Sequence, residues 1–223
     1  RILFLNETKR AKKIITVSEF SKKEMLKYYN VDANKIEVVP NAWQHYLGVS
    51  FDDSVYEKYK LRPKSYYFSM CSLEPNKNFK WIAEMAKINK KMIFVVAGAI
   101  NKKIFADGLG FECPNNMKLI GYINDSEAKS LMKGCQAFLF PSFYEGFGIP
   151  PLEALSAGCE NIIVSDTDIM HEIFDESANY ISPYSYVFGD IQIIPQKKIK
   201  EVLQKYSWEK SASLLKEIIV HNL

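Results

Sequence analysis

Short apolar runs alternate with amphipathic stretches along most of the chain. Between residues 65 and 183, six runs rich in β-branched and aromatic residues predict strands, and helical spacing or turn signals separate them. The run "KMIFVVAGA" is almost continuously apolar, which is typical of a strand covered on both faces. This rhythm predicts an α/β domain with a Rossmann-like parallel sheet. The predicted strands cover residues 65–72, 91–99, 116–123, 136–142, 160–166 and 179–183.

The rest of the chain divides around this series. Two runs, 12–18 and 35–43, predict strands on either side of a helix that Ser18 caps. Alternation is lost over residues 44–63, and spacing becomes helical again near the C-terminus. We therefore predict four parts: the end of an N-terminal domain at 1–48, a linker at 49–64, the Rossmann-like domain at 65–190, and a helical segment at 191–223. Residues 100–115 are expected to form a helix or loop.

Composition and charge exclude several classes of protein. The 223 residues are 48% hydrophobic and 25% charged, as in ordinary globular proteins, and a net charge of +3 does not indicate nucleic-acid binding. Four cysteines without a CxxC pair and three isolated histidines predict reduced thiols, a cytoplasmic protein and no metal site. The lysine clusters at 9–13 and 22–23 leave two alternatives open: peripheral association with the inner face of a membrane, or simple solvated faces.

The stretch "FPSFYEGFGIPPLEAL" places two carboxylates, Glu145 and Glu153, on either side of a sharp turn. It follows a predicted strand, and ligands bind at the carboxyl ends of strands in open parallel sheets. Gly146 and Gly148 permit strained backbone and close approach to a ligand. Pro151 suits the start of a helix whose amides form an anion site, with Glu153 expected in its first turn. The alternative is that Glu153 only complements the helix dipole and Glu145 is solvated.

A second strand-to-helix turn, "LEPNKN", carries Lys77, which offers a positive charge to a phosphate group. A lysine in a loop is more often simply solvated. Two such turns at the same edge of a sheet indicate a phosphate-binding crevice more strongly than either turn alone.

Four segments, taken in order, resemble the retaining nucleotide-sugar glycosyltransferases of family 4, which have the GT-B fold. They are "SLEPNKN", "LIGYINDSEAKSLMKGCQAFLFPSFYEGFGIPPLEALSAGC", "SDTDIMHEI" and "YSWEKSA". The E-x7-E element of that family corresponds to Glu145 and Glu153. The stretch "ITVSEFSKKEML…KIEVVPNAW" is similar to the end of the family's first domain. The resemblance implies that residues 65–190 bind the nucleotide-sugar donor and that the chain is truncated at its N-terminus.

The resemblance also implies roles for individual residues. Glu153 would hydrogen-bond the ribose hydroxyls of the donor, and Glu145 would lie near the sugar and the diphosphate as a catalytic residue. Lys77, the second catalytic candidate, would neutralise the leaving diphosphate. The turn of Gly146, Phe147 and Gly148 would meet sugar and phosphate groups through its backbone.

Three further positions would flank the base through their backbone: Gly121, Tyr122 and Ile123. Asn76 departs from the pattern, because the family usually has an arginine there that makes a bidentate phosphate contact. The stretch "CENII" after Gly158 also differs from the family's usual sequence at that place.

These features predict transfer of a sugar to a glycan or lipid-linked acceptor with retention of configuration, in surface polysaccharide or glycoconjugate assembly. The donor would be GDP-mannose or, slightly less favoured, a UDP-sugar, with no cofactor and no metal. One alternative is a nucleotide-sugar-binding domain without catalysis. A two-carboxylate glycoside hydrolase is disfavoured because the phosphate-type turns would have no purpose there.

Overall fold

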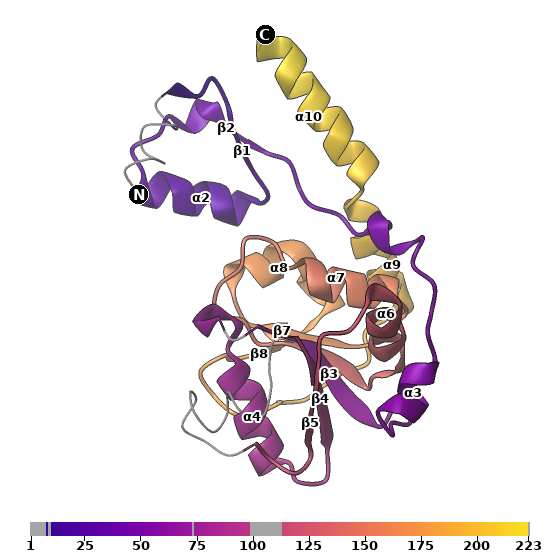
Figure 1. Cartoon of the computed structure of the whole chain (residues 1–223). Coiled ribbons are helices and arrows are strands. Elements are labelled where there is room, and N and C mark those ends of the chain that lie inside the picture. The colour runs from indigo at the N-terminus through magenta and orange to yellow at the C-terminus, as the bar shows by residue number, and fades with distance from the viewer. Residues whose placement is uncertain (1–7, 9, 73, 99–112, 223) are drawn as a thin grey trace.

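A six-stranded parallel sheet forms the centre of the main domain (Figure 1). The structure is a computed structural model that describes residues 8, 10–72, 74–98 and 113–222. The strand order is β5-β4-β3-β6-β7-β8, and every neighbouring pair is parallel. The six predicted strands and the Rossmann-like arrangement are confirmed. The bounds are β3 (Tyr66–Met70), β4 (Ile93–Ala97), β5 (Met117–Gly121), β6 (Ala137–Phe140), β7 (Ile162–Ser165) and β8 (Asn179–Ile181).

Helices cover the sheet on both faces. Alternate residues of each strand enter two different cores: Tyr67 packs with the side chains of α4, and Phe68 packs with those of α6, α7, α8 and α9. This alternation follows from the period of two in a strand, and it explains why the strand sequences are apolar throughout. The helices are α4 (Phe79–Ile88), α6 (Asp125–Gly134), α7 (Ile149–Ser156), α8 (Asp168–Phe174) and α9 (Gln196–Lys205). Part of the predicted element at 100–115, namely 100–112, lies outside the described residues.

The order of the strands creates a switch point between β3 and β6. The chain starts at β3, moves outward through β4 and β5, and then returns to the other side of β3 with β6. The loops that leave the carboxyl ends of β3 and β6 therefore turn in opposite directions, and such a switch point is where ligands bind in open parallel sheets. Both turns singled out in the sequence leave the sheet at this point.

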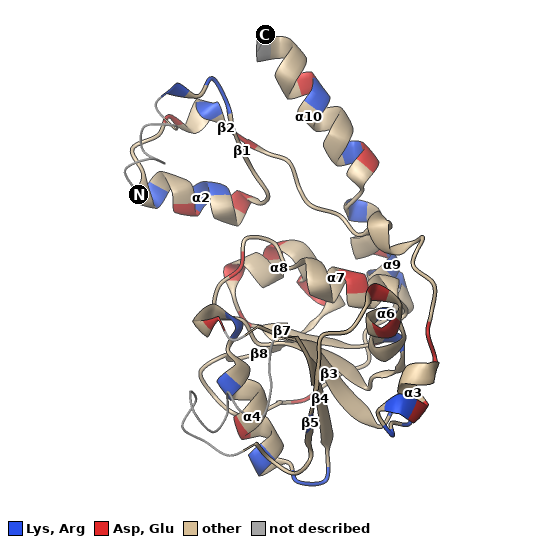
Figure 2. Ribbon diagram, in the orientation of Figure 1, with Lys and Arg blue, Asp and Glu red and all other residues tan. Residues whose placement is uncertain are grey.

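The N-terminal residues form a small unit beside the main domain, which it contacts through its helix (Figure 1). Its strands β1 (Ile14–Thr16) and β2 (Ile36–Val38) pair in parallel on either side of α2 (Glu19–Tyr28). The hydroxyl of Ser18 accepts a hydrogen bond from the N–H of Ser21 at 3.0 Å, so Ser18 caps α2 as expected. Figure 2 shows that basic and acidic residues alternate along α2, where Lys27 lies 3.7 Å from Glu24.

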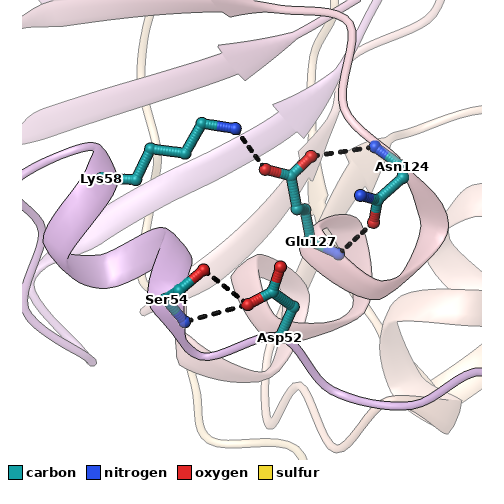
Figure 3. Close-up of polar contacts among 5 residues, drawn as sticks. All are labelled: Asp52, Ser54, Lys58, Asn124 and Glu127. Atoms are coloured by element: carbon teal, nitrogen blue, oxygen red, sulfur yellow. Dashed lines mark hydrogen bonds and ion pairs between the residues drawn. The ribbon is translucent and has the colours of Figure 1, made fainter.

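The segment predicted as a linker contains α3 (Ser54–Lys58), which packs against α6 (Figure 3). The ammonium group of Lys58 lies 2.5 Å from Oε1 of Glu127, whose side chain is only 9% exposed. Oε2 of Glu127 accepts from the N–H of Asn124, and the side chain of Asn124 accepts from the N–H of Glu127, which is a capping box. The same carboxylate therefore caps α6 and fastens α3 to it.

Hydrogen bonds also fix the N-terminal end of α3. Oδ1 of Asp52 accepts from the N–H and the hydroxyl of Ser54, at 3.1 and 2.6 Å (Figure 3). The N–H of Asp52 donates to the hydroxyl of Ser130 on α6 at 2.8 Å. The polar sequence of this segment thus reflects hydrogen bonding to the main domain.

The C-terminal helical segment consists of two helices, because the chain leaves the helical conformation at Tyr206 and Ser207 before α10 (Trp208–Asn222) begins. The indole N–H of Trp43 donates to the carbonyl of Leu203 at 2.9 Å, which connects the segment after β2 to α9. No described helix has both the length and the apolar composition needed to cross a membrane. Single 3₁₀ turns complete the described secondary structure: η1 (Ala33–Lys35), η2 (Gln44–Tyr46), η3 (Pro75–Lys77) and η5 (Asp175–Ser177).

Candidate functional site

The two predicted phosphate-type turns meet at the switch point. The ammonium group of Lys77, in the turn after β3, lies 2.8 Å from Oε1 of Glu145, in the loop after β6. The side chains are 27% and 14% exposed, so neither is freely solvated. The backbone of Asn76 accepts from the N–H of Phe143 at 2.7 Å, and its amide donates to the carbonyl of Tyr144 at 3.4 Å. Asn76, which stands where the family usually has an arginine, therefore links the two loops by hydrogen bonds.

A buried asparagine, which the sequence analysis did not single out, shapes the first turn. Asn78 has a left-handed backbone with φ of 52° between η3 and α4, a conformation that asparagine tolerates better than most residues. Its side-chain amide donates to the carbonyls of Pro141 and Pro183 at 3.0 and 2.9 Å. Asn78 therefore positions Lys77 relative to the loop that follows β6.

The glycine turn has one strained position rather than two. Gly148 has φ of 104° and directly precedes α7, whereas Gly146 does not have a positive φ. A Cβ atom at Gly148 would lie 3.0 Å from Cε of Met170. Phe147, between the glycines, is buried with its ring edge-on to Tyr206 at a centroid distance of 5.1 Å. The expectation of a backbone that needs glycine is confirmed at Gly148 and was wrong at Gly146, and close approach of a ligand at either glycine stays a prediction.

Helix α7 begins at Ile149, so Glu153 lies in its second turn and the expectation of the first turn was wrong. The reason is that Ile149 and Pro150 are already helical. Pro150 and Pro151 have no N–H group, so the free amides at this end of the helix are those of Gly148 and Ile149. The helix terminus therefore offers fewer donors to an anion than a helix without these prolines would offer.

The carboxylate of Glu153 has a basic partner that the sequence analysis set aside. Nε2 of His45 lies 2.7 Å from Oε1 of Glu153, whose side chain is 14% exposed. The indole N–H of Trp208 donates to Nδ1 of the same imidazole at 3.1 Å. His45 precedes the main domain by sequence and lies 108 positions from Glu153. No motif spacing could have indicated this pair, because its members come from distant parts of the chain.

The three predicted base-flanking positions lie at the carboxyl end of β5. Gly121 ends the strand with φ of 72°, and its carbonyl accepts from the N–H of Gly98 at the end of β4. Tyr122 is 83% exposed and Ile123 is half-buried. They share the sheet edge with Lys77, but β4 separates β5 from β3. A ligand reaching both would extend across three neighbouring strands.

The N-terminal unit contacts the glycine turn directly. The carbonyl of Gly146 accepts from the hydroxyls of Ser18 and Ser21 at 2.7 and 3.2 Å. The carboxylate of Glu172 on α8 accepts from two N–H groups at the start of α2, at 2.8 and 2.7 Å. These contacts connect the start of α2 to α8 and to the loop that carries Glu145, and no sequence motif had indicated them.

Cys71 lies at the end of β3, close to Lys77. It is buried, and burial raises the pKa of its thiol to about 12. A thiol with this pKa is neutral at physiological pH, and the thiolate is the nucleophilic form. Burial therefore disfavours Cys71 as a nucleophile at this site.

The fold and the site define an α/β protein with a Rossmann-like parallel sheet, in which paired turns at the switch point combine a lysine, two glutamates and a glycine bend. The model of the family described as Glycosyl transferases group 1 matches residues 55–186, more than half of the chain. The chain belongs to this family, and its fold is that of the GT-B glycosyltransferases.

Two curated relatives have related names. The O-antigen chain mannosyltransferase RfbU of Salmonella typhimurium is 29% identical over 187 residues, which cover 82% of this chain and 50% of the relative. The O-antigen chain mannosyltransferase B of Escherichia coli is 26% identical over 217 residues, which cover 91% and 54%. The chain thus spans about half the length of these relatives.

Solved structures share the fold at low sequence identity. Anabaena Alr3699/HepE, crystallised in complex with UDP-glucose, has a TM-score of 0.80 at 14% identity. The alignment covers 97% of this chain and 66% of the HepE chain. Sucrose-phosphate synthase from Thermosynechococcus elongatus has a TM-score of 0.76 at 12% identity, covering 96% and 60%.

Proposed function

We propose that this chain carries the donor half of a retaining glycosyltransferase that transfers a hexose from a nucleoside diphosphate sugar to a glycan or lipid-linked acceptor in surface polysaccharide assembly. The observation that carries the proposal is the meeting of Lys77 and Glu145 at the switch point, at 2.8 Å. The carboxylate of Glu145 holds the ammonium group of Lys77 at the carboxyl ends of β3 and β6. A diphosphate would offer that ammonium group a second partner with more negative charge.

In the proposed reaction, Lys77 stabilises the negative charge that develops on the leaving diphosphate as the glycosidic bond breaks. The free N–H groups of Gly148 and Ile149 add backbone donors at the same end of the sheet. Glu153 accepts hydrogen bonds from the ribose hydroxyls. The departing diphosphate takes the proton of the acceptor hydroxyl on the same face, which leads to retention. Lysine and amides supply positive charge, so the proposal needs no metal or cofactor.

Mannose is the sugar that the comparisons favour, because two relatives are named as O-antigen chain mannosyltransferases. We propose GDP-mannose as the donor and a UDP-sugar as the alternative. Cytoplasmic location and peripheral membrane contact accompany this proposal, since lipid-linked acceptors lie at a membrane surface. The ion pair of Lys13 with Glu37 at 2.6 Å removes one lysine from the basic clusters that such contact would use.

Titration calorimetry of the chain with GDP and UDP tests the donor site. We expect one nucleotide to bind, and expect Lys77→Ala and Glu153→Ala to weaken it about tenfold or more, because each removes a charged hydrogen-bonding partner. Two matched controls are Lys90→Ala, an exposed lysine beyond the C-terminal end of α4, and Glu160→Ala, an exposed glutamate beyond α7. If wild-type protein binds neither nucleotide, or if the controls lose as much affinity as the site variants, the proposed site is wrong.

The second candidate is a binding domain without catalysis, and the replacement of the family's arginine by Asn76 favours it. The two candidates differ in turnover. Incubating the chain with GDP-mannose, with water as the acceptor of the mannosyl group, and measuring released GDP and mannose separates them: release above that of Lys77→Ala supports the transferase, and binding without release supports the binding domain.

A further inference from the structure

His45 lies where three parts of the chain meet: the segment that enters the main domain, helix α7 and the first residue of α10. Its ring contacts Glu153 through Nε2 and Trp208 through Nδ1. An indole nitrogen can only donate a hydrogen bond, so Nδ1 of the imidazole must accept it. The proton of the neutral ring is then on Nε2. The contact of 2.7 Å with Glu153 is therefore an N–H donated to one carboxylate oxygen.

The backbone on both sides of this histidine is anchored. The side chain of Gln44 accepts from the N–H of Trp208 at 3.1 Å and donates to the C-cap carbonyl of α9 at 2.9 Å. On the other side, the buried ammonium group of Lys129 donates to the carbonyl of Tyr46 at 2.7 Å. The position of the imidazole is thus set by α6, by α9 and by α10 together.

We propose that His45 is a positioning residue for the donor: it holds Oε1 of Glu153 and leaves Oε2 directed to accept the ribose hydroxyls of the nucleotide. This inference rests on the proposed function. A carboxylate that is already oriented loses less side-chain freedom when the ligand binds, so the ligand binds more tightly. Because Trp208 selects the tautomer, α10 takes part in forming the donor site although it does not belong to the Rossmann-like domain.

The test compares GDP with 2′,3′-dideoxy-GDP by titration calorimetry of the whole chain, or the uridine pair if UDP is the nucleotide that binds. His45→Phe keeps a planar ring and removes the donor. We expect it to weaken GDP binding about three- to tenfold, the loss of one hydrogen bond to a charged group that is partly exposed, and to leave the dideoxy analogue nearly unchanged. His45→Gln keeps an N–H donor at a similar distance and should restore most of the GDP affinity.

Two further variants sharpen the result. Trp208→Phe removes the indole N–H together with one ring of the indole while keeping an aromatic side chain, and it should produce a smaller loss with the same preference for GDP over the analogue. His221→Gln changes a histidine near the end of α10 whose ring contacts the carbonyl of Glu217, so it should bind like wild-type protein.

The selectivity of the loss decides the outcome. Equal weakening of both nucleotides by His45→Phe would indicate general damage, tighter GDP binding would indicate that the histidine blocks the site, and unchanged binding would indicate no role; each overturns the inference. If Glu153→Ala weakens GDP binding while His45→Phe does not, only this inference fails. If wild-type protein binds no nucleotide, the proposed function fails first.

Discussion

Replacing Gly148 by alanine tests whether the bend between the two glutamates depends on a left-handed backbone. An L-residue at φ of 104° costs about 2 kcal/mol of strain. The added Cβ would meet Cε of Met170 at 3.0 Å and Cε2 of Phe174 at 3.5 Å. The methionine end can move, so this crowding adds less than about 1 kcal/mol. We expect Gly148→Ala to lower the free energy of unfolding by about 2–3 kcal/mol, a fall in Tm of roughly 5–10 °C.

Gly158→Ala is the matched control. Gly158 has φ of 95°, but its nearest neighbour to an added Cβ is Cγ of Lys133 at 3.9 Å. This variant should therefore lose about 2 kcal/mol from strain alone. Thermal and urea unfolding give the free energy of unfolding of both variants, and titration calorimetry gives their affinity for GDP. We expect only Gly148→Ala to weaken nucleotide binding. An unfolding curve for Gly148→Ala that matches wild-type protein would refute the strain argument, and unchanged GDP affinity would refute the role of the bend.

Two further predictions concern hydrogen bonds that stabilise the main domain. The hydrogen bond from Lys58 lowers the pKa of Glu127 below its ordinary value of 4.5, so this carboxylate stabilises the fold above that value and the stabilisation is lost as the pH falls through the folded-state pKa. Glu127→Gln keeps the capping box and should cost about 0.5–1 kcal/mol at pH 7; urea unfolding should show this difference shrinking toward pH 3, and a difference that does not change with pH would contradict the assignment. Asn78→Ala leaves two loop carbonyls without their amide donor and should lower the free energy of unfolding by about 1–3 kcal/mol; urea unfolding that matches wild-type protein would show that water replaces the amide.

The sequence predicted the sheet because hydrophobic periodicity is a local property. A strand buried on both faces must be apolar along its length, and all six runs became strands of one parallel sheet. The two turns were predictable for a related reason: glycine, proline and asparagine mark the ends of strands and helices wherever they occur. Lys77 and Glu145 were both found in this way, without knowledge that they touch.

Other features could not be predicted, because they depend on distant partners. The helix that begins at Ile149 rather than at Pro151 shows the limit of local signals for element ends. Ser18 was predicted as a helix cap, but its second contact, with the carbonyl of Gly146, lies 128 positions away. A side chain's sequence neighbours contain no information about such a partner.

By itself, the sequence determined the class of fold, the two turns and the chemical groups that they carry, since each follows from residue type and periodicity over short stretches. Only the tertiary structure decided which groups meet. The strand order placed the turn of Lys77 beside that of Glu145, and the packing of α10 placed Trp208 against His45, which contacts Glu153. The physical reason is that a hydrogen bond depends on distance and direction in space, and these are set only when the separate elements pack into one core.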